Sequence, residues 1–308
     1  MLGSDNLRGA FYMMLAMAGF TINDACMKAV TQTIPLYQAI ALRGAVTVAA
    51  LVLIAHLNGG LRLRLPAGAG LMVGLRTLGE VASTVAFLTA LMHMPLANLS
   101  AIMQSLPLAL TLAAALVFRE AVGWRRLTAI GVGFAGVLIV IRPGPEGFDI
   151  WALVGLAAVA AVVLRDLSIR RLPAAVPSVT VALYAAVAVT VFAFAMSATT
   201  PWQPIDPEAA LLLAGASGFL VVGYLFAVIV MRIGDIGFIS PFRYTALIWA
   251  IFLGWLVFGD FPDGWTLFGA ALVIGSGVFT LTRERALARR AARTAKAPPP
   301  PPPLPHPH

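Results

Sequence analysis

The sequence predicts an all-α integral membrane protein in which ten transmembrane helices form two inverted five-helix repeats. Three observations lead to this fold class. Hydrophobic residues make up 60% of the 308 residues and charged residues only 11%, whereas a soluble domain carries about 25% charged residues. The mean hydropathy is accordingly high, at +0.91. Apolar stretches of bilayer-crossing length recur along the chain, and the pattern of the first half returns in the second.

Short links that contain proline, glycine or charged residues separate the apolar spans. Each span is long enough to cross the hydrocarbon core as a helix, which satisfies its own backbone hydrogen bonds. We expect the first five spans at 9–31, 35–56, 68–91, 95–117 and 125–141, and the second five at 150–169, 176–198, 209–231, 237–258 and 264–282. Asn23, Asp24 and Lys28 interrupt the region after the first apolar run, so we expect this run to remain as a helix rather than a cleaved signal.

The two halves of the chain resemble each other residue by residue. Asp24 and Lys28 match Asp166 and Arg170 at a constant offset of 142. Residues 118–142 align with 258–283, matching Phe118 with Phe258, Glu120 with Asp260, Trp124 with Trp265 and Arg142 with Arg283. Because five is odd, the second copy enters the membrane inverted, an arrangement typical of secondary transporters with a substrate site between the halves. We expect a first repeat at 9–142, a second at 149–283, and a disordered, basic and proline-rich cytoplasmic tail at 284–308.

Arginine residues gather on one side of the predicted topology. With a cytoplasmic N-terminus, the cytoplasmic loops hold Arg8, Arg62, Arg64, Arg119, Arg125, Arg126, Arg170, Arg171, Arg232 and the basic tail. The loops on the other side hold mainly acidic residues: Glu146, Asp149, Asp206, Glu208, Asp260 and Asp263. Short loops rich in lysine and arginine stay in the cytoplasm, so we expect both termini to be cytoplasmic.

Charged and polar side chains interrupt the apolar spans. A charge at the bilayer centre costs about 2.5–3.5 kcal/mol, so such residues persist where they face a cavity or a partner. Asp24 and Lys28 share one helix face, as do Arg76 and Glu80. We assign to a central substrate cavity Asp24, Lys28, Arg43, Arg76, Glu80, Ser83, Gln104, Tyr224, Arg243, Tyr244 and Trp249.

Each of these charges also has a structural explanation. Asp24 with Lys28, and Arg76 with Glu80, are spaced so that each pair can neutralise itself and only hold helices together. Arg43 has no neighbour of opposite charge in its own span. It must therefore meet either the substrate or a carboxylate from another helix, with Glu80 and Asp24 as the competing partners.

Two further pairs of residues have assigned roles. Glu80 and Asp24 are titratable groups inside the spans, which makes them candidates for proton coupling. Arg165 and Asp166 lie near the cytoplasmic end of their span, where an interfacial anchor is the favoured explanation.

Composition disfavours several other classes of function. The single Cys26 excludes an internal disulfide and a multi-thiolate metal site, and only His56 and His93 lie outside the tail, so we expect no metal and no cofactor. The net charge of +8 resides mainly in loops that set topology, so we expect no nucleic-acid partner. The G-x-G-x-x-G pattern at 131–136 lies within an apolar span rather than after a strand, which indicates close helix packing and not nucleotide binding.

At this point the sequence resembles a known family. Ten spans in two halves, each with an acidic residue (Glu120, Asp260) before a glycine-rich final helix, are similar to the EamA branch of the drug/metabolite transporter superfamily. The stretch "NLRGAFYMMLAMAGFTINDACMKAV" and Arg43 are also similar to bacterial members. The likeness covers 9–283. It implies a basket of ten helices, a location in the bacterial inner membrane and alternating access. Members move amino acids, nucleobase-type metabolites, vitamins such as riboflavin, S-adenosylmethionine and drugs, so the resemblance does not name the cargo.

Two classes of function follow. The first is a secondary transporter of a small polar or amphipathic metabolite, amino-acid-like or vitamin-like, with the lipid bilayer as its other partner. The chain has no G-x-x-x-x-G-K-[ST] motif for direct ATP hydrolysis, and an excess of basic residues in the spans favours a substrate with a carboxylate. The alternative is a membrane-embedded lipid-modifying enzyme or a non-transporting scaffold. An enzyme would need a nucleophile–base pair or a metal cluster, and a scaffold would leave the inverted repeat unexplained.

Overall fold

A computed structural model describes residues 2–57, 66, 68–119, 123–142, 149–172, 178–230 and 236–296. Glu120 and the end of the tail, 297–308, lie outside these residues. The first half comprises α1 (Leu2–Val30), α2 (Leu36–Leu57), α3 (Gly70–His93), α4 (Leu96–Met103), α5 (Leu106–Phe118) and α6 (Trp124–Ile141). The second comprises α7 (Ile150–Arg170), α8 (Ser178–Ser197), α9 (Pro207–Val230), α10 (Ile236–Ile239), the 3₁₀ helix η1 (Ser240–Tyr244), α11 (Thr245–Phe258) and α12 (Gly264–Lys296).

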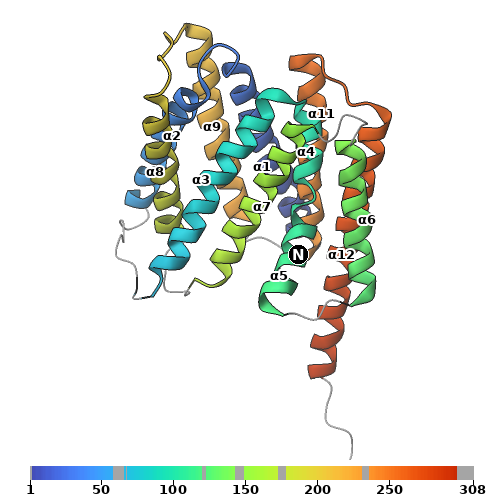
Figure 1. The fold of residues 1–308 in the computed structure, drawn as a ribbon. Coiled ribbons are helices and arrows are strands. Elements are labelled where there is room, and N and C mark those ends of the chain that lie inside the picture. The colour runs from blue at the N-terminus through green and yellow to red at the C-terminus, as the bar shows by residue number, and fades with distance from the viewer. Residues whose placement is uncertain are drawn as a thin grey trace, which may run out of the picture.

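The described residues form ten apolar helical spans and no strand, which confirms the predicted fold class. The helix α12 continues to Lys296, so the basic stretch at 284–296, expected within a disordered tail, is helical. Figure 1 shows the spans running alternately up and down between two ends of the molecule. We call the end where α3 begins and α7 finishes the lower end, and the opposite end the upper end.

Two equivalent spans, the fourth of each half, are broken within the apolar region. The fourth span divides into α4 and α5 at Gln104 and Ser105, just before Pro107. The ninth divides into α10, η1 and α11 around Pro241. Proline lacks the N–H that would continue the helical ladder. Irregular backbone at membrane depth occurs where it is buried in protein or lines a cavity, so these breaks point to the interior.

The helix pairings are related by exchange of the two halves. The most extensive pairs are α1 with α9, α3 with α7, α6 with α12 and α2 with α8. The helices α1, α2, α3 and α6 of the first half correspond to α7, α8, α9 and α12 of the second. The pair of α1 with α9 is therefore equivalent to the pair of α7 with α3, whereas α2 with α8 and α6 with α12 each join two equivalent helices. The two repeats therefore interlock around a pseudo-two-fold axis, as an inverted repeat requires.

Close pairing divides the spans into two bundles (Figure 1). The first bundle holds α1, α2, α3, α7, α8 and α9, and the second holds α4, α5, α6, α10, η1, α11 and α12. Each bundle contains spans from both repeats. The seam between the bundles is formed chiefly by α1 against α11 and by α7 against α4 and α5.

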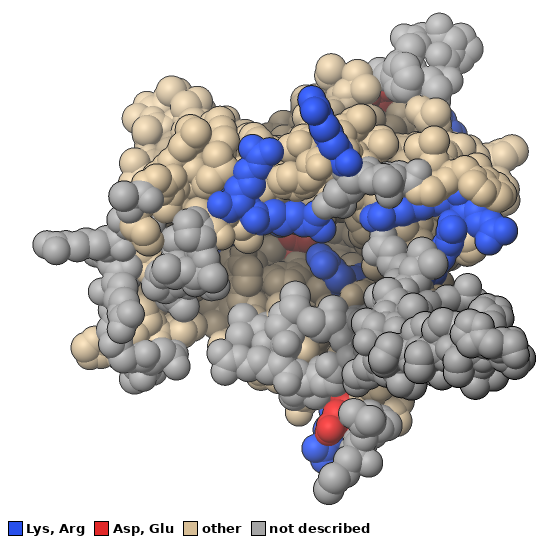
Figure 2. Space-filling model, turned by 90° about the horizontal axis from the view of Figure 1, so that it is seen from below, with Lys and Arg blue, Asp and Glu red and all other residues tan. Residues whose placement is uncertain are grey.

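The charged residues separate between the two ends as the sequence predicted. Arg8, Arg119, Arg125 and Arg171 lie in elements that begin or finish at the lower end, whereas Asp149, Asp206, Glu208, Asp260 and Asp263 lie at the upper end. Seen from the lower end, the molecule is hollowed in its middle, with lysine and arginine atoms beside the hollow and acidic atoms within it (Figure 2). The described residues thus leave a hollow at the basic end of the molecule (Figure 2).

The close packing of α6 against α12 allows a test of how far the stability of the fold depends on small residues. A Cβ on Gly136 would lie 2.6 Å from the carbonyl oxygen of Gly269, whereas a Cβ on Gly131 meets nothing within 4 Å. We expect Gly136→Ala to lower stability by about 1–3 kcal/mol through overpacking, measured as a lower melting temperature in detergent. Gly131→Ala, on the same helix, is the control and should match or slightly exceed the parent. Equal effects of the two substitutions would contradict the close approach.

Candidate functional site

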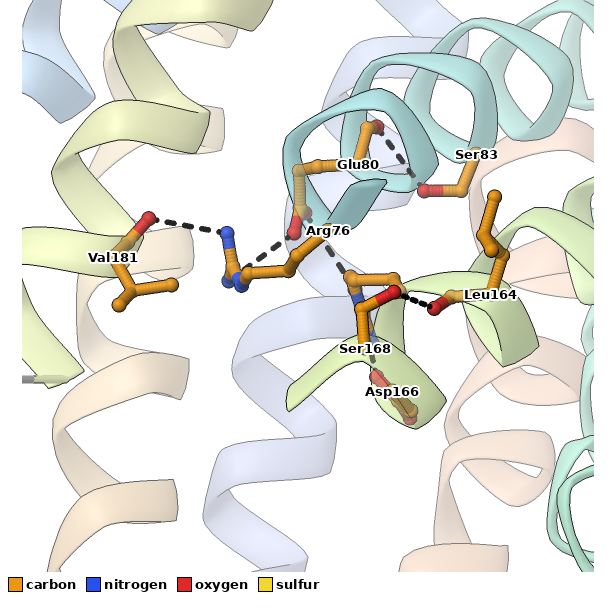
Figure 3. Close-up of polar contacts among 8 residues, drawn as sticks. Arg76, Glu80, Ser83, Leu164, Asp166, Ser168 and Val181 are labelled. Atoms are coloured by element: carbon orange, nitrogen blue, oxygen red, sulfur yellow. Dashed lines mark hydrogen bonds and ion pairs between the residues drawn. The ribbon is translucent and has the colours of Figure 1, made fainter. Parts of the chain in front are cut away.

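Four charged side chains on α3 and α7 form a chain of ion pairs (Figure 3). Glu80 is shared: one carboxylate oxygen lies 3.4 Å from Arg76 Nη2 and the other lies 3.5 Å from Arg165 Nη1. Arg165 also donates through Nε to Asp166 Oδ1 at 2.8 Å. Glu80 is 18% exposed and Arg76 is 13% exposed, so each charge depends on its neighbours more than on solvent.

The close crossing of α3 and α7 brings these residues together. A Cβ on Gly79 would lie 2.9 Å from both the carbonyl oxygen of Ala161 and the backbone nitrogen of Arg165. Glycine therefore lets the two backbones approach to the distance at which Glu80 reaches Arg165. Arg76 extends the other way and donates to the carbonyl oxygen of Val181 on α8 at 3.2 Å.

A second charged group lies on α1 and α2. Asn23, which is buried, donates from Nδ2 to Asp24 Oδ1 at 2.8 Å and accepts from Arg43 Nη1 at 3.2 Å. The neutral amide thus bridges a carboxylate and a guanidinium. Arg43 also lies within electrostatic range of Glu80, which connects this group with the ion pairs of α3 and α7.

Tyr224 on α9 lies between the two groups. Its hydroxyl lies close enough to Glu80, Arg165, Arg43 and Arg76 to interact electrostatically with each of them. Its ring packs edge-on against Phe20 of α1, with centroids 5.4 Å apart, yet the residue remains 47% exposed. We call the whole set the central polar cluster: Asn23, Asp24, Arg43, Arg76, Glu80, Arg165, Asp166 and Tyr224.

The remaining residues assigned to the cavity lie elsewhere. Ser83 is buried one turn along α3 and donates to the carbonyl oxygen of Glu80 at 3.1 Å. Gln104 donates to the carbonyl oxygen of Tyr244 at 3.2 Å, which ties the two broken spans together. The side chain of Arg243 is exposed. Trp249 packs in an aromatic and methionine cluster of α1, α9 and α11.

Lys28 and Tyr244 have local structural roles. Tyr244 is buried, and its hydroxyl lies where a side chain at Gly277 of α12 would be. Lys28 is at the upper end of α1, where its ammonium donates to the carbonyl oxygen of Met94 at 2.6 Å and lies 3.9 Å from Asp260 Oδ2. Neither side chain is among the residues that form the central polar cluster.

One of the alternatives that the sequence left open, the pairing of Asp24 with Lys28, is not observed. Asp24 and Lys28 are close enough in sequence to pair, but Asp24 turns to Asn23 while Lys28 turns to Asp260. The reason is that Lys28 lies at the end of its helix, where the loop after α11 supplies a carboxylate. In the central polar cluster three arginines face three carboxylates, so the excess of basic residues in the spans comes from Lys28 and Arg243, which lie outside the cluster.

Sequence reasoning left Asn23, Arg165 and Asp166 out of the site. Asn23 interrupts the first apolar run, but its side chain is uncharged and the sequence gives no indication that it bridges two charged groups. Arg165 and Asp166 were assigned to the membrane interface from their place near the end of a span. The offset of 142, which matches Asp24 with Asp166, was the signal that placed both aspartates at equivalent positions of the two repeats.

The described residues contain no group of three or more His, Cys, Asp or Glu side chains that could hold a metal ion. The cluster is instead a set of fixed charges and hydrogen-bonding groups within a bundle of apolar helices. Such a set can bind polar groups of a small molecule and can exchange protons through its carboxylates.

A comparison with protein families matches the EamA-like transporter family over residues 7–142 and 149–282. The chain belongs to this family. The two matched regions coincide with the two halves whose helix pairings are related by exchange. One solved crystal structure aligns with 96% of this chain and 100% of its own, with a TM-score of 0.58 at 19% identity, a likeness that shows the fold alone.

Several characterised transporters are similar to this member of the family. The riboflavin transporter of Vibrio cholerae is 29% identical over 62% of this chain and 64% of its own length. An S-adenosylmethionine uptake transporter of Rickettsia conorii is 24% identical over 62% of this chain and 65% of its own. The chain thus spans just under two thirds of these two relatives. The pseudopaline exporter of Pseudomonas aeruginosa is 22% identical over 86% of this chain and 93% of its own. The printed names of these three relatives are all those of transporters of small molecules.

The shared carboxylate of Glu80 gives the first test of the site. In Glu80→Gln, Arg76 and Arg165 lose a common anionic partner while largely withdrawn from water, so we expect stability to fall by about 1–3 kcal/mol. The measurement is the melting temperature in detergent. The matched control is Asp263→Asn, which removes a carboxylate from an exposed ion pair with Arg142 and should change stability little. A larger effect of the control would show that the Glu80 pairs are not the stronger ones.

Proposed function

We propose that the protein is a secondary transporter that moves a small polar or amphipathic metabolite across the bacterial inner membrane by alternating access. The observation that carries the proposal is the central polar cluster, in which both repeats contribute charges to one group inside a bundle of ten membrane spans. A charged side chain that faces lipid costs free energy of insertion without a compensating contact. A substrate site, in contrast, needs polar groups that replace the water around the substrate. The substrate site comprises Asp24, Arg43, Arg76, Glu80 and Tyr224, with Asn23, Arg165 and Asp166 added.

The chemistry of the cluster supports an amino-acid-like or vitamin-like substrate. Asp24 and Arg43 present opposite charges on either side of the Asn23 amide, which suits a molecule with both a cationic and an anionic group. In this proposal, aromatic rings of α1 and α9 form the adjoining wall of the site, among them Tyr12, which stacks on Phe226 with centroids 5.5 Å apart. A planar ring would pack against such a wall. The relatives named for riboflavin and S-adenosylmethionine carry ring systems of this kind as cargo, in agreement with this assignment.

Transport in liposomes is the direct test. The purified protein should accumulate at least one member of a panel of zwitterionic and ring-containing metabolites. Arg43→Gln should lower the transport rate about ten-fold or more, because it removes the cation that Asn23 orients toward the cavity. Leu78→Ala is the control, since Leu78 is exposed on the outer face of α3 and should leave transport unchanged. Absence of transport for every member of the panel would argue against the proposal.

Thiol labelling distinguishes a wet cavity from a lipid-facing surface in the same assay. In a Cys26→Ala background, a water-soluble thiol reagent should label Tyr224→Cys, and the transported metabolite should slow this labelling. Leu71→Cys and Leu78→Cys replace residues exposed on α3, which face lipid in this proposal, and should not react. Labelling of positions 71 and 78 but not 224 would contradict the proposed site, because water would then reach the face of α3 that the proposal assigns to lipid.

The orientation in the membrane is a further part of the proposal. The lower end carries most of the arginines, so we place it, with both termini, in the cytoplasm. Reporter fusions after residues 122, 172 and 234 should then give a cytoplasmic signal, and fusions after 145, 204 and 262 the opposite signal. A cytoplasmic signal at 204 would contradict the ten-span topology with inverted halves.

A further inference from the structure

Contacts across the seam between the two bundles decide which end of the molecule is closed. At the upper end, Lys28 of the first bundle meets the end of α11 in the second bundle. Its ammonium lies 5.1 Å from the ring centroid of Phe258, 3.9 Å from Asp260 Oδ2 and 2.6 Å from the carbonyl oxygen of Met94. The Lys28 side chain is only 11% exposed. Two of these contacts, with Phe258 and Asp260, cross the seam, whereas Met94 caps α3 within the first bundle and holds the ammonium in place.

The lower end of the seam has a related contact. The guanidinium of Arg171, at the end of α7, lies 5.1 Å from the ring centroid of Phe118, at the end of α5. Phe118 is the equivalent of Phe258 in the other repeat, and Arg171 adjoins Arg170, the equivalent of Lys28. Each end of the seam thus has a basic residue from the first span of one repeat over a phenylalanine from the fourth span of the other. The lower contact is weaker, because the side chain of Arg171 is exposed.

We propose that Lys28, Phe258 and Asp260 form a latch that closes the upper end of the seam, with Arg171 and Phe118 as its counterpart at the lower end. The inference rests on the alternating-access transport proposed above and adds the residues that separate when access changes side. A closed upper latch agrees with the hollow at the lower end (Figure 2). Opening the upper end exchanges the contacts of Lys28 with Phe258 and Asp260 for water, while the contact of Arg171 with Phe118 at the lower end is kept.

Two other polar links at the upper end lie within single bundles. Gln38, fully buried on α2, donates to the carbonyl oxygen of Gln203 at 2.8 Å and accepts from the Gln203 N–H at 2.9 Å. Arg142, at the end of α6, pairs with Asp263 before α12. That hydrogen bond and one from the Thr266 backbone lower the pKa of Asp263 to about 2, so the pair stays ionised at neutral pH. Because these links do not cross the seam, they remain intact in the proposed opening and provide controls.

The test measures a distance across the upper seam. Spin labels are attached to Gln32→Cys, at the end of α1, and Phe261→Cys, after α11, in a Cys26→Ala protein reconstituted in lipid nanodiscs; both positions are exposed. Pulsed electron resonance should show a major short distance and a minor longer one. Lys28→Met should raise the ratio of long to short distances roughly five-fold, the effect of losing one ion pair and one cation–π contact. Asp260→Asn should shift the ratio in the same direction by less.

The matched control is Arg142→Gln, which removes a cation from the same end but within one bundle and should leave the ratio unchanged. Adding Arg171→Met to Lys28→Met should reverse part of the shift, because it weakens the opposite closed state. Equal shifts in Arg142→Gln and Lys28→Met, or no shift in Lys28→Met, would overturn the latch. The measurement needs no substrate. A shift without transport would therefore leave the latch standing and count against the proposed function alone.

Discussion

An ionised side chain in a membrane span must find its partner inside the protein, and the arrangement of this molecule follows from that constraint. Insertion of a charge at the bilayer centre costs about 2.5–3.5 kcal/mol. Glu80 offsets this cost for two arginines at once, because it lies between Arg76 on its own helix and Arg165 on α7. A rotation of α3 would keep the pair of Arg76 and Glu80, which share this helix, but would separate Glu80 from Arg165 and leave Arg165 with Asp166. The ion pairs therefore set the rotation of α3 relative to α7.

Such pairs require helices at short range, and small residues provide it in the same way in both repeats. Gly79 of α3 lies against Ala161 of α7, and a Cβ on Gly19 of α1 would lie 3.0 Å from the Gly223 nitrogen of α9. Gly19 and Ala161 are related by the offset of 142 that relates Asp24 to Asp166. One crossing is thus used twice, and each copy brings a charged group of its own to the centre. The site is symmetric in position but not in chemistry, since Asn23 in one repeat corresponds to Arg165 in the other.

The length and number of the spans could be predicted because both follow from hydrophobicity along the chain. The inverted repeat was also accessible, since Asp24, Lys28 and Phe118 have matches in the second half. The ion-pair partner of each charged side chain could not be predicted from the sequence. The spacing of Asp24 and Lys28 favoured a pair within one helix, but the choice of Asp260 depends on where the loop after α11 lies. Local spacing describes one helix, whereas a partner from another helix depends on packing that no single segment contains.

The proposed site and the proposed latch share one rigid element. Asp24 and Lys28 are four residues apart on α1, about 6 Å along the helix axis at 1.5 Å per residue. In the proposed transport cycle, a substrate bound beside Asp24 would shift α1, and the same shift would move Lys28 relative to Phe258 and Asp260. Because α1 packs closely on α9, we expect α9 to move with it. The proposed latch would thus explain a charge in this apolar span, because the contacts of Lys28 with Phe258 and Asp260 depend on the position of α1 relative to the other bundle.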